Sequence, residues 1–158
     1  MHKLNPHVKP LALETLLTML ENSVGTKMFQ TIWAEVDGEK KDITEQGNLS
    51  CAFYVSGVLA MFGLIDRIHS TVSGTVLEME KYGWQKTKVL KPGVVMVWNP
   101  GENSQFTNQH IGFYLGQEQA ISNSWQKGVI AKHHYTFGKV GSKEYRPIVA
   151  MYRHPKLK

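Results

Sequence analysis

The stretch that decides the fold is HIGFYLGQEQAISNS, residues 110–124. It holds two runs rich in strand-forming residues, 110–115 and 119–124, separated by a polar turn at 116–118. Another β-rich run, VVMVW at 94–98, follows a Lys-Pro-Gly turn. These runs predict an antiparallel sheet in the second half of the chain. Further short strands are expected at 128–130, 133–137 and 148–152.

Helical periodicity dominates the first half of the chain instead. Leucines at helical spacing predict a helix over 11–20. An apolar stripe that includes Cys51 predicts a second helix, opening at Leu49 and running to Leu64. A shorter helical region is expected within 65–82, before Gly83.

Two segments between these helices are less regular. Residues 26–36 present a helical or mixed apolar face, and residues 37–48 are polar with two glycines, which indicates a surface loop. Helices followed by an antiparallel sheet are the α+β layout. A length of 158 residues fits one domain over 1–158, with tails expected at 1–10 and 153–158.

Composition excludes several classes of protein. The single cysteine excludes an internal disulfide framework and a Cys-rich zinc site. No apolar run approaches the ~20 residues of a membrane span, and no signal peptide is visible. The net charge of +5 favours anionic partners, but no nucleic-acid-binding motif accompanies it. The location stays open between export by another route, a phage or toxin origin, and the cytoplasm.

Cys51 is the first candidate for chemistry, because it lies where its helix is expected to begin. The free N–H groups and dipole of a helix N-terminus lower the pKa of a thiol and favour the nucleophilic thiolate. The same N–H groups can hold an oxyanion. The alternative is that Cys51 is a small buried hydrophobic residue of the helix stripe.

A cysteine nucleophile needs a base, and His110 is the best placed of the histidines. It opens a strand directly after a long polar loop, where its side chain can face a cleft. A polar group on the next strand, at 122–124, is within reach to orient the imidazole, and the amide of Asn123 is the chemically preferred choice. The other histidines are expected to be solvated, exposed or structural, and they are His2, His7, His69, His133, His134 and His154.

The order of cysteine helix, histidine strand and polar residue resembles the NlpC-type papain-like cysteine peptidases, relatives of the CHAP amidases. Three segments carry the resemblance: LSCAFYV at 49–55, LKPGVVMVW at 90–98 and HIGFYLG at 110–116. The family has Asp-Cys-Ser-Gly around its nucleophile, whereas this chain has Ser50, Ala52 and Phe53 there. The resemblance covers about 11–152, nearly the whole chain.

The family's third polar residue stands twelve positions after the histidine, which is Ser122 here. Spacing therefore favours Ser122, whereas side-chain chemistry favours Asn123. A bulge that slips the strand by one residue would exchange the two, because neighbouring residues point to opposite faces. A dyad of Cys51 and His110 without a third residue is the remaining alternative.

The resemblance implies a thiol protease or amidase that hydrolyses peptidoglycan peptides in cell wall degradation. Cys51 would attack the amide carbonyl and His110 would move the proton, with no metal or cofactor. Tyr54 and Trp125 are candidate substrate contacts. Expected partners are peptidoglycan or another peptide, and an immunity protein remains open. The alternatives are a catalytically inactive binding module on the same scaffold and an amidase with a substrate outside the cell wall.

Overall fold

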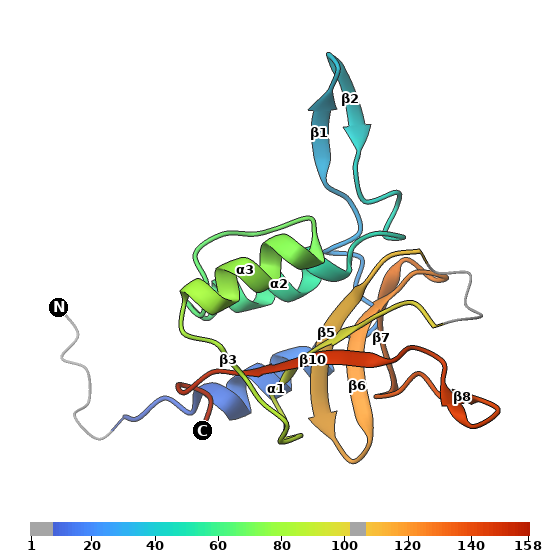
Figure 1. Ribbon diagram of the computed structural model, residues 1–158. Helices are drawn as coiled ribbons and strands as arrows, with labels where there is room; N and C mark the ends of the chain where they lie inside the picture. Colours follow the sequence, from blue (N-terminus) through green and yellow to red (C-terminus); the bar gives the residue numbers. More distant parts are fainter. Residues whose placement is uncertain (1–7, 102–106) are drawn as a thin grey trace, which may run out of the picture.

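The computed structural model describes residues 8–101 and 107–158, which form three helices, one large antiparallel sheet and two small two-stranded sheets. In this part of the chain, the main sheet has six strands in the order β3-β10-β4-β5-β6-β7, and every pairing is antiparallel (Figure 1). The strands are β3 (Gln85–Lys86), β4 (Val95–Trp98), β5 (His110–Gly116), β6 (Gln119–Ser124), β7 (Val129–His134) and β10 (Ile148–Arg153). The α+β expectation is confirmed at this level.

The hairpin of β5 and β6 forms where the sequence predicts it, and it lies inside the sheet between β4 and β7. Its turn places Gly116, Gln117 and Glu118 in the left-handed backbone region, with φ of 101°, 50° and 60°. The pairing shifts by one residue between Tyr114 and Gly116, which is a bulge at the end of the hairpin. This shift determines which β6 side chains share a face with those of β5.

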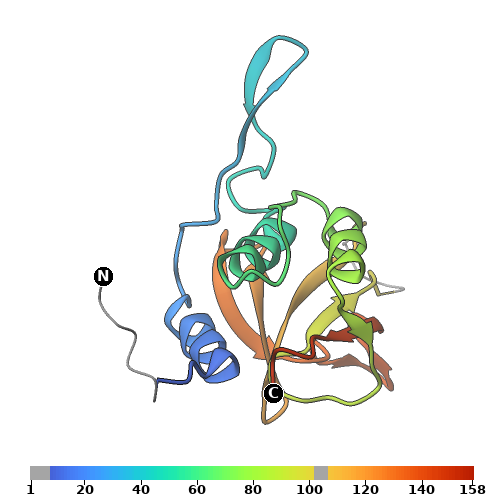
Figure 2. The same cartoon turned by 90° about the vertical axis from the view of Figure 1, so that its left-hand side faces the viewer.

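The helices are α1 (Ala12–Asn22), α2 (Cys51–Met61) and α3 (Val72–Lys81), as Figure 2 shows beside the sheet. Helices α2 and α3 fall within the segments predicted to be helical, and α1 extends two residues beyond the predicted 11–20. Helix α2 packs against β5 and β6, where Val55 and Leu59 enter the main core with Ile111 and Phe113. Burying side chains of this size contributes ~1.5–3 kcal/mol each, so the core holds the start of α2 against the sheet.

The segment from 26 to 48 differs from its prediction. Instead of a helical face and a loop, it forms the hairpin of β1 (Trp33–Val36) and β2 (Glu39–Asp42), which projects from the domain in Figures 1 and 2. The turn residues Asp37 and Gly38 have φ of 55° and 81°. Asp-Gly with positive φ at both positions is the preferred two-residue turn of a β-hairpin, and this local signal outweighs the apolar spacing of 26–36.

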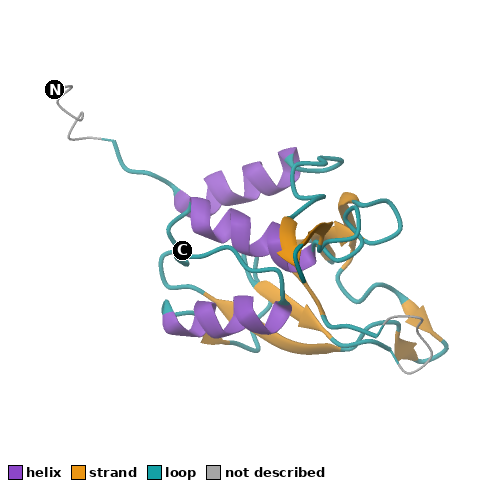
Figure 3. Ribbon diagram, turned by 90° about the horizontal axis from the view of Figure 1, so that it is seen from above, coloured by secondary structure: helices purple, strands orange, loops and turns teal. Residues whose placement is uncertain are grey.

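The last third of the chain differs in its details. The two strands expected at 128–130 and 133–137 are one continuous strand, β7. The short strands β3, β8 (Lys139–Val140) and β9 (Lys143–Glu144) were not expected. Figure 3 shows the helices and sheet from above, with β8 and β9 forming a small hairpin of their own at the rim.

The C-terminal end differs from the tail expected there. Residues 1–7 lie outside the described residues, and residues 8–10 are exposed. At the other end, the prediction that His154 is solvated is wrong. His154 is 6% exposed, its ring lies 5.2 Å from that of Trp84, and its Nε2 bonds to the carbonyl of Tyr82. In the described ranges, every helix is too short or too polar to cross a bilayer.

Candidate active site

The thiol of Cys51 lies at the first residue of α2, where the free N–H groups of the helix start gather. Ser50 precedes it as the cap residue, without a hydrogen bond from its side chain to the helix. The backbone N–H groups of Ile111, Ala52 and Cys51 itself are directed toward the sulfur and favour a negative charge there. The site can therefore hold an anion at or beside this atom.

Burial nevertheless reverses the expected effect on the thiol. Removal from water disfavours the thiolate and is the largest influence, so the pKa of Cys51 is raised above its ordinary value despite the N–H groups and the positive charge of Arg146. The prediction of a lowered thiol pKa is corrected accordingly. At neutral pH, the resting sulfur carries its proton.

His110 begins β5 and lines the same cavity as Cys51. The cavity has a volume of about 800 Å³. In the described part of the chain, the hydrogen bond of the His110 ring runs to Ser122, and the ring is not hydrogen-bonded to Cys51. Hydroxyl and amide side chains make up much of the cavity wall, and the residues beside Cys51 and His110 are Glu45, Asn48, Leu49, Ala52, Ser70, Thr71, Val72, Ser73, Thr107, Asn108, Gln109, Trp125 and Arg146.

The imidazole of His110 is held neutral. It is 7% exposed and packs against Trp98 and Phe137, with ring centroids 5.8 and 5.5 Å apart. Burial lowers its pKa well below the ordinary histidine value, and the charge of Arg146 lowers it further. A neutral imidazole beside a protonated thiol is a base that has not yet taken its proton.

The structure brings Ser122, and not Asn123, to His110. Ser122 Oγ lies 2.8 Å from His110 Nε2. The side chain of Asn123 bonds instead to the carbonyl oxygen of Gly47, in the loop that leads to Cys51. The bulge before Gly116 puts Ser122 on the face of His110 and turns Asn123 toward α2. The expectation that Asn123 orients the imidazole of His110 is therefore wrong.

The two aromatic candidates for substrate contact, Tyr54 and Trp125, lie in different surroundings. Tyr54 is fully buried, and its hydroxyl bonds to Ser23 Oγ at 2.7 Å, so the expectation that it contacts substrate is wrong. Its ring packs against Phe29 and Phe113, which makes it a core residue. Trp125 is half-buried and lines the cavity, and its contact with a substrate stays a prediction.

Sequence reasoning missed Arg146 and the environment of His133. Arg146 is 3% exposed, its Nη2 donates to the carbonyl of Asn108 at 2.7 Å, and burial lowers its pKa to about 10. His133, expected to be structural, lies 2.8 Å from Ser122 Oγ through its Nε2. No spacing motif marks either residue. The one sequence signal is that Arg146 lies two positions before the apolar strand β10.

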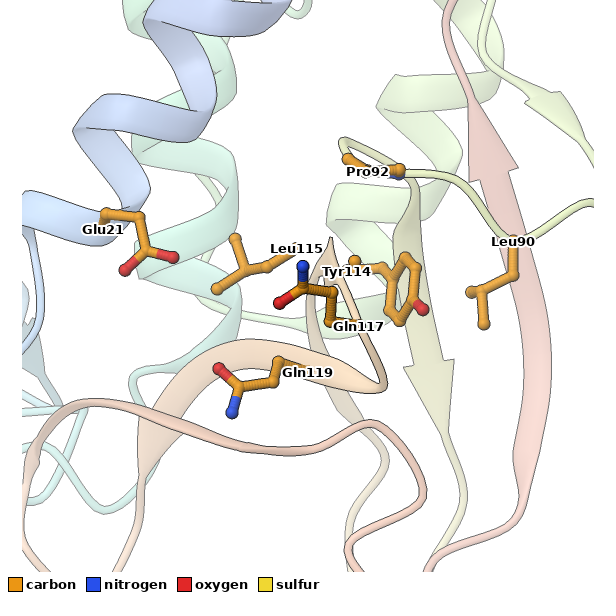
Figure 4. A pocket seen from close by; sticks show the side chains of 8 residues that line it. Glu21, Leu90, Pro92, Tyr114, Leu115, Gln117 and Gln119 are labelled. Atoms are coloured by element: carbon orange, nitrogen blue, oxygen red, sulfur yellow. The ribbon is translucent and has the colours of Figure 1, made fainter.

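Within the described ranges, no group of three or more His, Cys, Asp or Glu side chains is arranged to hold a metal ion. A second cavity of about 540 Å³ lies at the turn of β5 and β6, away from the His110 end of the strand (Figure 4). Glu21 of α1 and Tyr114, Gln117 and Gln119 of the hairpin line it, and it contains neither Cys51 nor His110.

Comparison with known proteins gives a likeness of fold. No family model matches the sequence, and no curated protein matches it. Among solved structures, the chain is similar to NlpC2 from Trichomonas vaginalis, with a TM-score of 0.57 and 16% sequence identity. The match covers 98% of this chain and 50% of that chain, so this chain spans about half the length of its neighbour. The fold is therefore NlpC-like.

Proposed function

We propose that this protein is a cysteine hydrolase that cleaves amide bonds in peptidoglycan peptides. One observation carries the proposal: Cys51 at the start of α2 and His110 at the start of β5 line one cavity. Helix-borne cysteine and strand-borne histidine, far apart in sequence and together at a polar cavity, are the parts that acyl transfer through a thiol requires.

The proposed reaction starts from the neutral pair. As Cys51 Sγ forms a bond to the substrate carbonyl carbon, the thiol proton passes to His110, and the carbonyl oxygen becomes an oxyanion held by backbone N–H groups at Ala52 and Ile111. His110 then gives this proton to the leaving amine. Water hydrolyses the acyl-enzyme, with His110 again taking and returning a proton. Because the resting thiol and imidazole are not hydrogen-bonded, their approach accompanies substrate binding.

The character of the cavity supports a peptide attached to an anionic polymer. Hydroxyl and amide groups around the cavity suit the polar backbone of a peptide, and Trp125 offers one aromatic surface. Arg146 supplies positive charge near Cys51, and the chain carries a net charge of +5. A basic protein accumulates near anionic cell-wall polymers through long-range attraction.

Two alternatives share this scaffold. A catalytically inactive binding module is favoured by the protonated, half-buried thiol of Cys51. An amidase that acts outside the cell wall would use the same residues on a different peptide. The first alternative requires binding without turnover, and the second requires turnover of a soluble peptide without turnover of cell wall.

The test is digestion of purified peptidoglycan sacculi, with released fragments identified by mass spectrometry and new amino groups counted by derivatisation. The wild-type chain is compared with Cys51→Ala and His110→Ala. His134→Ala is the matched control, because His134 lies outside the cavity. Thermal unfolding of each variant confirms that it is folded.

The expected result is release of new amino groups by the wild type and by His134→Ala, with a loss of at least about 1,000-fold in the other two variants. Binding of sacculi without release would overturn the proposal in favour of the inactive module. Equal release by Cys51→Ala would also overturn it. Cleavage confined to soluble acyl-peptides would replace the substrate with one outside the cell wall.

A further inference from the structure

Ser122 bonds to two histidines rather than one. Its Oγ lies 2.8 Å from Nε2 of His110 on β5 and 2.8 Å from Nε2 of His133 on β7. The three strands lie side by side (Figure 1). Their registers place the three side chains on one face of the sheet. On the other side of the His133 ring, Nδ1 lies 2.8 Å from the backbone carbonyl of His134.

That carbonyl determines the direction of each hydrogen bond that links His133, Ser122 and His110. A carbonyl oxygen accepts only, so His133 Nδ1 must carry the proton and donate it. In a neutral His133, Nε2 then has a lone pair and accepts from the hydroxyl of Ser122. The Ser122 oxygen in turn accepts from Nε2–H of His110. His110 is left with an unprotonated Nδ1, which is the nitrogen that can act as a base.

The surroundings keep His133 neutral. Burial lowers the pKa of His133 to about 4; the bond to the His134 carbonyl opposes this effect, and the charge of Arg146 adds to it. The remaining titratable neighbour, His110, is itself held neutral by burial. At pH 7 both rings therefore carry one proton each, as the hydrogen-bond directions require.

Packing prevents the His133 ring from turning over. It stacks on Phe137 with the ring centroids 3.9 Å apart and the planes 17° apart, and Trp98 meets it edge-on at 5.7 Å. Gly112 of β5 makes the close approach of β6 possible, because a Cβ there would lie 2.7 Å from Ser122 Cβ. Packing therefore fixes the position of the His133 ring, and the close strand approach fixes that of Ser122.

We propose that His133 is a positioning residue, which acts through Ser122 to hold His110 as the Nε2–H tautomer with Nδ1 free as the base. Its role in catalysis rests on the proposed hydrolase activity, whereas its effect on the tautomer does not. No proton needs to pass from His110 through Ser122 to His133. When Nδ1 of His110 takes the thiol proton, the existing bond from Nε2–H to Ser122 becomes charge-assisted and stronger.

The test reads the tautomers directly, by ¹⁵N NMR of the imidazole nitrogens in histidine-labelled protein at pH 7. The wild type is compared with His133→Phe, which removes the acceptor, and with His133→Gln, whose amide oxygen can accept from Ser122. His134→Ala is the matched control, because it keeps the backbone carbonyl and removes a ring whose partners are Thr136, Glu118 and Tyr135, outside the bonds of Ser122. The kcat/KM on the best cleaved substrate is measured in parallel.

We expect Nδ1–H for His133 and Nε2–H for His110 in the wild type and in His134→Ala. In His133→Phe, the freed Ser122 hydroxyl can donate to His110, so the two tautomers of His110 mix. The kcat/KM then falls about 10- to 100-fold, a fraction of the roughly 100- to 10,000-fold that a positioned base contributes. In His133→Gln, His110 is again the Nε2–H tautomer, and kcat/KM lies within about threefold of the wild-type value.

An Nδ1–H tautomer of His110 in the wild type would overturn the role of His133, whatever the activity. So would a His110 in His133→Phe that stays entirely in the Nε2–H tautomer. If His133→Phe does not fold, the wild-type tautomers and His133→Gln still decide. The expected tautomers without any hydrolysis would leave the arrangement standing and would contradict the proposed function instead.

Discussion

Replacing Gly112 by alanine should break the bond between His110 and Ser122 while leaving the protein folded. A Cβ at this position would lie 2.6 Å from the carbonyl oxygen of Ile121 and 2.7 Å from Ser122 Cβ. Ordinary contact begins at 3.4 Å, so β5 and β6 must separate locally by about 0.8 Å. The same movement stretches the 2.8 Å bond of His110 to Ser122 to about 3.6 Å, which is too long for a hydrogen bond.

The cost of this overpacking is about 1–3 kcal/mol in the free energy of unfolding. Urea denaturation measures it, and imidazole NMR with the hydrolysis assay measures the state of His110. The control is Gly63→Ala, because a Cβ there meets no atom within 4 Å but φ is +62°. That variant loses a comparable ~1–2 kcal/mol through backbone strain alone and should keep the His110 tautomer and activity.

Loss of stability in Gly112→Ala with an unchanged His110 tautomer would refute this reasoning. It would mean that the strands absorb the methyl group without moving Ser122. Equal loss of activity in Gly63→Ala would refute it differently, by showing that activity follows stability and not the geometry of this face.

Three further predictions follow from the same structure. Because the pKa of Cys51 is raised, its alkylation by iodoacetamide should be slow at pH 7 and should accelerate only above the ordinary thiol range; fast labelling below pH 8 would contradict the burial argument. Asn123→Ala should cost about 1–3 kcal/mol, since it leaves the buried carbonyl of Gly47 without its donor, yet it should not alter the His110 tautomer; urea denaturation and NMR separate the two. The pKa of Asp42 is lowered, first by its bond to Thr44, so its stabilising effect is present above pH 3.8 and is lost as the pH falls through the lower folded value; Asp42→Asn should remove this acid dependence, as thermal unfolding between pH 2 and 6 would show.

Local signals were sufficient for much of the fold. The leucine spacing of 11–20 gives a helix in any context that buries one face, and alternation on either side of 116–118 gives a hairpin. They failed at 26–36, where apolar residues at helical spacing belong to a strand and its approach. They failed again at His154, because only the packing of Trp84 beside it shows that this residue is covered.

The candidate site divides in the same way. The positions of Cys51 and His110 at the starts of their elements are local properties, and the sequence predicts them. The choice between Ser122 and Asn123 depends on a single bulge in the strand pairing, which exchanges the faces of all residues beyond it. Neither spacing nor side-chain chemistry can locate such a bulge.

The sequence by itself determined the order of the helices and strands, the basic charge and the one available thiol. Only the tertiary structure decided that this thiol is protonated, because the pKa of Cys51 depends on burial by residues distant in the chain. It also decided that His133 and Arg146, from separate strands and loops, lie beside His110. Proton positions in this site follow from hydrogen bonds across three strands, and such bonds exist only after the sheet has formed.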